Sequence, residues 1–206
     1  MKRLLIAVIL MIIPSFLFSE AISFRGGESS LSLKEGHEEV KLSSGASVQV
    51  GSLSITSDEI VLSGQDWRYV ECTGKTEIKD DERGLEITTT HLWYDRTDER
   101  LLLSPWFELE DKKEELNAMG GALSYDMKNE KLELSMLVSI LKTSERGLMR
   151  CRAESVIFNR DTQKLSFSGG ATVNWAGDQY QAEVIAVDLS NDSISLDGRI
   201  KGNING

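Results

Sequence analysis

The chain has 206 residues, with 33 acidic and 23 basic side chains, and its formal net charge at pH 7 is −10. This length suits one domain, and the acidity argues against nucleic acid as a partner, because phosphate binding needs clustered Lys and Arg. Two cysteines, Cys72 and Cys151, are too few for a disulfide scaffold, and the sequence leaves open whether they pair.

The first 21 residues have the layout of a secretory signal peptide. The positive start MKR precedes an apolar run over residues 4–18, and small residues follow at Ser19 and Ala21. The run is shorter than the roughly 20 apolar residues that span a bilayer. We therefore predict export to the periplasm, cleavage after about Ala21, and a single domain over residues 22–206. A segment that is retained as an inner-membrane anchor is the alternative.

A repeat runs through the rest of the chain. A polar residue ends a short apolar segment at Ser63, Asp95, Asp126, Asn159 and Asp188, with spacings of 32, 31, 33 and 29 residues. These anchors and the runs after them, such as RTDE and MKNE, are typical of turns. Apolar residues two apart on either side indicate strands with one inward face. Each unit is predicted to be strand, turn, strand, with a further strand on its N-terminal side.

The inward positions of the repeat are the candidate site residues, and they occur at constant offsets from the anchors. The predicted lining comprises Leu53, Ile55, Ile60, Leu62, Leu85, Ile87, Leu92, Tyr94, Leu101, Leu103, Leu123, Tyr125, Leu132, Leu134, Val156, Phe158, Leu165, Phe167, Ile185 and Val187. Six residues before each anchor the side chain is small: Ser57, Thr89, Gly120, Ala153 and Ala182.

Two units depart from this pattern: the first has a charged residue at an inward offset, as expected where a stack of repeats ends in water, and the fourth has an ambiguous register. The same offsets turn Tyr69 and Glu71 inward in the first unit, although Glu71 is charged. In the fourth unit they turn Met149 and Cys151 inward, whereas matching the repeated tetrapeptide ERGL would shift that strand by one residue and turn both outward. We predict the inward orientation for Met149 and Cys151, with a β-bulge reconciling the two alignments.

About six such units, counting a less regular opening unit over residues 22–50, would give on the order of 14 to 16 antiparallel strands of typical length. Stacked units share one apolar interior. Periodicity alone fits two architectures: a compact sandwich or solenoid with a filled core, or an elongated open jelly roll with an apolar groove between two sheets.

Four segments carry a shared pattern: LSSGASVQVGSLSITSDEIVLSG at 42–64, GLEITTTHLWYD at 84–95, CRAESVIFNRDTQKLSFSGGATV at 151–173 and YQAEVIAVDLSNDSISLDG at 180–198. With the export signal, this pattern resembles the OstA-like family of lipopolysaccharide-transport proteins, which includes LptA and LptC. The resemblance implies an all-β, elongated open β-jelly roll of stacked antiparallel hairpins that binds the acyl chains of lipopolysaccharide or a related glycolipid. It also implies an inner-membrane anchored partner and an outer-membrane barrel partner, and it allows end-to-end homo-oligomers.

No pattern in the sequence indicates an enzyme, a cofactor or a metal site. The two histidines, His37 and His91, stand alone, and motifs such as H-E-x-x-H, G-x-S-x-G and the phosphate loop are missing. The rival to a lipid carrier is therefore a structural or scaffold β-repeat protein of the envelope that binds no lipid. An anchored subunit similar to LptC is the third possibility.

Overall fold

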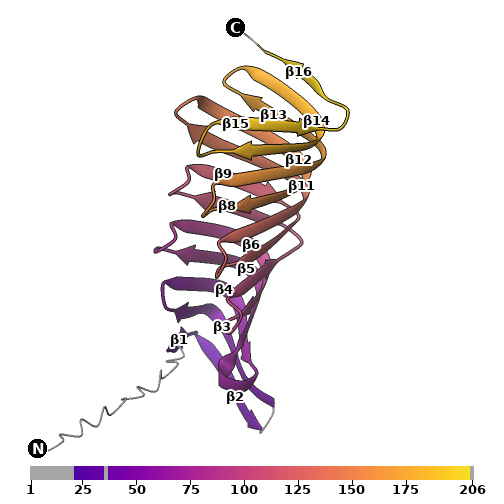
Figure 1. Ribbon diagram of the computed structural model, residues 1–206. Coiled ribbons are helices and arrows are strands. Elements are labelled where there is room, and N and C mark those ends of the chain that lie inside the picture. Colours follow the sequence, from indigo (N-terminus) through magenta and orange to yellow (C-terminus); the bar gives the residue numbers. More distant parts are fainter. Residues whose placement is uncertain (1–20, 35–36, 205–206) are drawn as a thin grey trace, which may run out of the picture.

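The computed structural model describes residues 21–34 and 37–204, and over these residues the protein is all-β (Figure 1). The described residues form sixteen strands in one sheet, in which every pairing is antiparallel, and one short 3-10 segment, η1 (Gln65–Trp67), joins two of them. The predicted fold class, stacked antiparallel hairpins in an elongated body, is confirmed. The predicted signal peptide lies almost wholly outside the described residues, so it stays a prediction, as does the domain that starts at residue 22.

The strands follow the chain along the stack (Figure 1). They are β1 (Ile22–Arg25), β2 (Glu28–Lys34), β3 (His37–Val50), β4 (Leu53–Ser63), β5 (Tyr69–Asp80), β6 (Leu85–Asp95), β7 (Arg100–Leu103), β8 (Phe107–Asp111), β9 (Leu116–Gly120), β10 (Ala122–Asp126), β11 (Lys131–Ser144), β12 (Gly147–Asn159), β13 (Lys164–Trp175), β14 (Asp178–Asp188), β15 (Ser193–Asp197) and β16 (Lys201–Asn203). Most neighbours in the sequence are neighbours in the sheet, and β1 and β2 both pair with β3.

Each long strand bends once, at a β-bulge. The register shifts lie between Ser43/Ala46, Thr56/Glu59, Thr73/Thr76, Ser135/Val138, Arg152/Ser155 and Ser168/Ala171. Because a bulge kinks its strand, these shifts form a corner that runs along the whole stack. The repeat's small side chains lie at this corner; Ser57, for example, is hydrogen-bonded there to Thr76 at 2.9 Å between the hydroxyl oxygens.

The corner divides the sheet into two halves that face each other. Half-sheet I contains β1, β8, β9, β16 and one end of each long strand; half-sheet II contains β2, β7, β10, β15 and the other ends. The free edge of half-sheet I ends in turns at 51–52, 81–84, 112–115, 145–146 and 176–177, which we call row 1. The free edge of half-sheet II ends in turns at 64–68, 96–99, 127–130, 160–163 and 189–192, which we call row 2.

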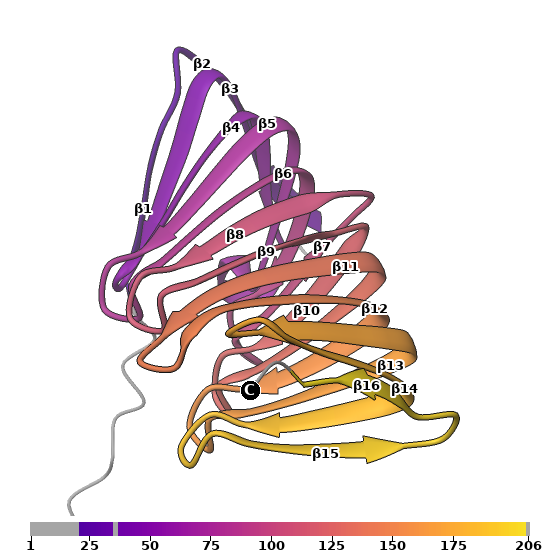
Figure 2. The same cartoon turned by 90° about the horizontal axis from the view of Figure 1, so that it is seen from above.

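Turns within a row are stacked on one another. In row 2, the backbone N–H of Met127 donates to the Glu99 carbonyl at 3.0 Å, and the N–H of Arg160 donates to the Glu130 carbonyl at 3.0 Å. Within residues 21–34 and 37–204 no strand pairing joins the two rows. The line along which the rows face each other, which we call the seam, is therefore held by side chains rather than by a backbone ladder. Figure 2 shows the stack from above, with the long strands turning along its length.

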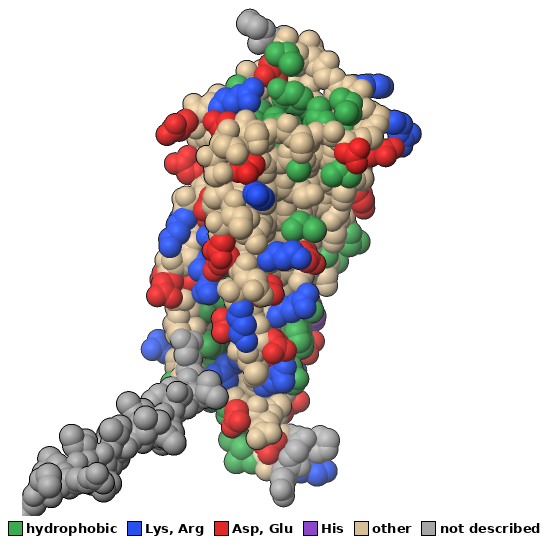
Figure 3. Space-filling view, in the orientation of Figure 1, with side chains coloured by type: hydrophobic (Ala, Val, Ile, Leu, Met, Phe, Trp, Pro, Cys, Tyr) green, Lys and Arg blue, Asp and Glu red, His purple; other side chains and the backbone are tan. Residues whose placement is uncertain are grey.

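The anchor residues form the predicted turns. Asp95 Oδ1 accepts the N–H of Thr97 at 2.9 Å, and Asn159 Oδ1 accepts the N–H of Thr162 at 2.8 Å. Asp126 and Asp188 make the same kind of bond. In the space-filling view, Lys, Arg, Asp and Glu are interspersed over much of one face, and apolar side chains gather near the C-terminal end (Figure 3). No helix of the described residues is long and apolar enough to cross a membrane.

Candidate functional site

All twenty predicted lining residues point into the space between the half-sheets. Each of them exposes 3% of its surface or less, and all belong to one continuous apolar cluster that runs along the stack. Met149 and Cys151 are buried as well, so the predicted inward register of that strand is confirmed. That these residues contact lipid stays a prediction.

In the first unit the predicted register is wrong. Val70 and Cys72 are fully buried, whereas Glu71 is exposed and Tyr69 is half-buried. The cause is the turn after Ser63, which contains η1 and is longer than the turns of the later units. The extra length shifts β5 by one residue, and this exchanges its two faces.

Part of the lining was missed because it lies beyond the corner on the C-terminal side of each anchor. The missed residues include Ile78, Phe107, Leu109, Val138, Ile140, Val173 and Trp175, all of them buried. The bulge resets the alternation of inward and outward side chains, so the offsets of six and eight residues after each anchor do not extend into the strand halves that follow the corner. The glycine pair 169–170, with φ of 81° and 68°, is the local signal that could have placed the reset in β13.

The interior is filled by the protein's own side chains in this conformation. Large residues such as Phe107, Tyr125, Phe167 and Trp175 are wholly enclosed. A cavity of about 10 Å³ remains, with room for about one water molecule; it is lined by Leu53, Ile78, Asp80, Leu85, Ile87, Leu101, Tyr125 and Met127. An acyl chain needs far more space, so the half-sheets must separate before one can enter.

A larger cleft of about 630 Å³ opens on the seam near the N-terminal end of the stack. From the row 1 side it is lined by Val50, Ser52, Leu53, Glu82 and Arg83, and from the row 2 side by Asp66, Arg68, Tyr94, Arg96, Thr97, Glu99, Met127 and Lys128. We call it the seam cleft. Leu53, Tyr94 and Met127 are buried and form an apolar floor under the charged rim. Leu53 and Met127 also line the small interior cavity, so they separate that cavity from the seam cleft.

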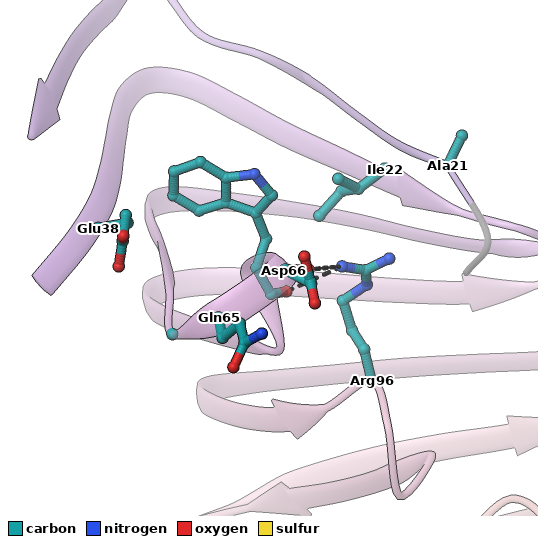
Figure 4. Close-up of a pocket in the computed structure, with 8 residues that line it drawn as sticks. Ala21, Ile22, Glu38, Gln65, Asp66 and Arg96 are labelled. Carbon is teal, nitrogen blue, oxygen red and sulfur yellow. Dashed lines mark hydrogen bonds between the residues drawn. The ribbon is translucent and has the colours of Figure 1, made fainter. Parts of the chain in front are cut away.

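The rim of the seam cleft is held by ordered polar contacts. Arg68 Nε donates to both carboxylate oxygens of Asp95, at 2.9 and 3.0 Å. Arg96 Nη1 donates to the carbonyls of Asp66 and Trp67, both at 2.9 Å. Figure 4 shows Arg96 directed at the η1 turn from the side of a second cleft, of about 450 Å³, which shares Asp66 and Arg96 with the seam cleft.

An ion cluster bridges the seam beside this cleft. It consists of Asp80, Arg83, Asp111, Glu130 and Arg160, and we call it the seam ion cluster. Arg83 of row 1 donates from Nε to Glu130 Oε1 of row 2 at 2.7 Å, and Arg160 of row 2 donates from Nε to Asp111 Oδ2 at the edge of half-sheet I, also at 2.7 Å. Arg160 also bonds Glu130.

Burial and hydrogen bonding act in opposite directions on the acids of this cluster. Burial alone would raise the pKa of Glu130, but hydrogen bonds from Tyr125 and the two arginines outweigh it and lower that pKa. The pKa of Asp80 is lowered in the same way, against burial, by bonds from Arg83 and Ser52. Both carboxylates are therefore ionised at neutral pH, and the cluster is charged on both sides.

The remaining candidate groups, His91 and the two cysteines, do not line the seam cleft. His91 lies on the outer surface with Nε2 at 3.2 Å from Glu71 Oε1. Cys72 in half-sheet II and Cys151 in half-sheet I are free thiols, and burial raises the pKa of both to about 12. In the described part of the chain no three His, Cys, Asp or Glu side chains are grouped so that they could hold a metal ion.

Comparisons with known proteins do not assign this chain to a family. No protein-family model matches the chain, and no curated protein matches its sequence. Among solved structures, the chain is similar to the crystal structure of LptH, described as the LptA-homologous periplasmic component of the lipopolysaccharide transport device of Pseudomonas aeruginosa. That match covers 91% of this chain and 96% of the other, at 11% identity and a TM-score of 0.30. A likeness at this level carries no functional argument, and the fold described above rests on the strands and registers of this chain.

Proposed function

We propose that this protein is a periplasmic lipid carrier that shields the acyl chains of lipopolysaccharide or a related glycolipid between its two half-sheets during transport to the outer membrane. The observation that carries the proposal is the seam cleft, whose apolar floor of Leu53, Tyr94 and Met127 lies directly over a continuous apolar interior. Inner-membrane anchored and outer-membrane barrel proteins would be its partners at the two ends of that path.

The energetics suit a carrier that performs no chemistry. Moving the half-sheets apart breaks side-chain contacts along the seam but no strand pairing, because no ladder joins the rows in the part of the chain that the structure describes. An acyl chain that takes the place of the displaced contacts gains about 0.8 kcal/mol for each buried methylene. Exchange between the filled and the lipid-bound states can therefore be nearly balanced, and this balance allows a cargo to be both held and released.

The test is site-specific photocrosslinking with a labelled glycolipid. A photoreactive side chain at the inward positions Leu101, Leu132 or Phe158 is expected to capture the lipid. The same group at the outward neighbours Leu102 and Ile157, which are 39% and 41% exposed, is the matched control and is expected to capture none. Equal labelling of inward and outward positions, or no labelling at all, would refute the carrier.

The filled interior favours one other function, that of a structural or scaffold protein of the envelope. In that case the side chains around Phe107 and Trp175 are permanent core, and no lipid enters. Mass spectrometry of lipid that co-purifies with the protein distinguishes the two functions without any label. N-terminal sequencing of the exported protein separates a cleaved carrier from an anchored subunit, because cleavage is expected after about Ala21.

A further inference from the structure

The seam ion cluster differs from the other ion pairs of the turns in the direction in which it runs. Arg68–Asp95 joins two turns of row 2, and Arg146–Asp178 joins two turns of row 1. The pairs Arg83–Glu130 and Arg160–Asp111 instead connect row 1 or the edge of half-sheet I with row 2. Arg160 Nη2 also donates to the Arg83 carbonyl at 2.9 Å, so the backbone of one row is tied to a side chain of the other.

The cluster lies where the seam cleft meets the interior. Arg83 lines the seam cleft, and its Nη2 donates to the Met127 carbonyl at 3.4 Å. Met127 and Leu53 form the partition between that cleft and the interior cavity. On the inner side, Asp80 and Tyr125 line the cavity, and the Tyr125 hydroxyl donates to Glu130 Oε2 at 2.7 Å. The same ion pairs that join the rows therefore hold the partition in place.

We propose that the seam cleft is the entry port for an acyl chain and that the seam ion cluster gates it. The chain enters between Leu53 and Met127 when Arg83 and Glu130 separate, and the seam closes over it when they pair again. This inference rests on the proposed lipid-carrier function, and it adds the place of entry and the groups that control entry.

The exposure of the paired groups supports a reversible gate. Asp111 and Arg160 are nearly enclosed, at 1% and 8% side-chain exposure, whereas Glu130 and Arg83 are 19% and 24% exposed. Charges that already touch water regain hydration when they part, so the outer pair opens at little cost. The inner pair would be left uncompensated in an apolar setting, which favours closing. The gate is thus expected to open from the Arg83–Glu130 side, the side of the seam cleft.

The experiment measures how fast a fatty acid enters the protein. Stopped-flow fluorescence with cis-parinaric acid is compared between wild type and Glu130→Gln, a substitution of equal size that can still accept the Tyr125 hydrogen bond. We expect entry roughly tenfold faster in Glu130→Gln, equivalent to about 1.4 kcal/mol in the barrier. The matched control is Asp178→Asn, which removes an ion pair that lies along row 1 only and is expected to leave the rate within about twofold, since ion pairs with an exposed partner are weak.

The outcomes separate the gate from the carrier. If wild type and both variants bind the probe at the same rate, the gate is refuted and the carrier stands. If none of the three binds it, the carrier is refuted and the gate with it. Should Glu130→Gln fail to fold by near-ultraviolet circular dichroism, Arg83→Lys replaces it, because it keeps the charge but loses the bridge to the Met127 carbonyl. Faster entry is expected there too, and an unchanged rate refutes the gate.

Discussion

Asp95 shows how one repeat anchor can be both a turn residue and an ion-pair partner. Its Oδ1 accepts the backbone N–H groups of Thr97 and Asp98, while Arg68 approaches the same carboxylate. Burial alone would raise the pKa of Asp95, but the bond from Arg68 and the two backbone donors outweigh it, so that pKa is lowered. The sequence predicted the turn from the residue type, but it contained no signal for Arg68, which is 27 positions away.

The lowered pKa of Asp95 predicts a defined pH dependence of stability. A carboxyl group with a lower pKa in the folded state stabilises the fold above its unfolded pKa of about 3.9 and loses this contribution as pH falls through the folded value. Asp95→Asn is expected to lower the free energy of unfolding by about 1 to 3 kcal/mol at pH 7. The gap to wild type should narrow as the pH drops below about 4.

Urea unfolding at a series of pH values measures this gap. Asp161→Asn, at an exposed position of another row 2 turn, serves as the control and is expected to change stability by less than about 0.5 kcal/mol throughout. A gap for Asp95→Asn that stays constant down to the lowest pH would show that the carboxylate charge contributes nothing.

Gly74 allows close packing at the corner. Its φ is 89°, and a Cβ added there would lie 2.7 Å from the Cβ of Asp58, whose Oδ2 accepts the N–H of Lys75 at 2.8 Å. Gly45 has a similar φ of 84° at the corner of β3, but it has open space around it. Gly45→Ala should cost about 1 to 2 kcal/mol from backbone strain alone, and Gly74→Ala about 1 to 3 kcal/mol more from the clash. Equal losses in thermal unfolding would contradict the packing argument.

At the scale of the strand, the corner of β11 differs from the others. Its bulge contains Met136 and Leu137 with φ of 69° and 61°, whereas the bulge of β13 has the glycine pair 169–170. A left-handed backbone costs free energy in any residue that has a Cβ. Packing offsets little of that cost at Leu137, because this side chain is 83% exposed. The strain follows from residue choice rather than from topology.

Leu137→Gly is therefore expected to stabilise the protein. Removing the left-handed strain gains about 1 to 2 kcal/mol, and the added freedom of glycine in the unfolded chain costs about 0.5 to 1 kcal/mol, so we expect a net gain near 0.5 to 1 kcal/mol. Ile157→Gly, in the regular part of β12 and 41% exposed, is the control and should lose about 1 kcal/mol. Chemical denaturation compares the two, and a loss for Leu137→Gly would place a stabilising contact at that side chain.

The strands also show how far alternation can predict a structure. At fixed offsets from the anchors it selected twenty positions, on both sides of the corner, that are all buried, because a buried face forces every second side chain to be apolar. It failed where the backbone count changes: at Tyr69 and Glu71, after the longer first turn, and in the strand halves that follow the corner on the C-terminal side of each anchor. Those changes are set by turn length and backbone dihedral angles, which apolar spacing does not record.

At the scale of the whole molecule, the contacts across the seam could not be predicted from the sequence. Arg83 and Glu130 are 47 positions apart, and Arg160 and Asp111 are 49 apart. Each of these residues lies in a charged turn or directly beside one, so nothing in its neighbourhood distinguishes it from solvated turn residues such as Asp161. Only the meeting of the two rows makes these residues a cluster, and that meeting depends on the bend in every strand between them.

At the two ends of the stack, apolar residues of the inner face are exposed to solvent. Leu31 pairs with the buried Val40 and so lies on the inner face, but it is 60% exposed. At the other end, Ile194 and Leu196 pair with Val187 and Ile185 and are half-buried. Within the described residues, β2 pairs only with β3 and β15 only with β14, so their outer edges have no partner strand there. Unpaired edges with apolar neighbours are the places where sheets join.

The exposed ends predict that the protein associates end to end, with β2 of one copy against β15 of the next. Sedimentation velocity over a range of concentrations should show reversible oligomers for wild type.

Leu31→Lys puts a charge on the inner face at the joint and is expected to weaken this association at least about tenfold, or roughly 1.4 kcal/mol. Leu102→Lys, halfway along the stack and on the outer face, should leave it unchanged. Because β2 is exposed throughout, Leu31→Lys should also keep the wild-type melting temperature, so lost association cannot be attributed to unfolding. A wild-type protein that stays monomeric at every concentration would contradict end-to-end association of this chain.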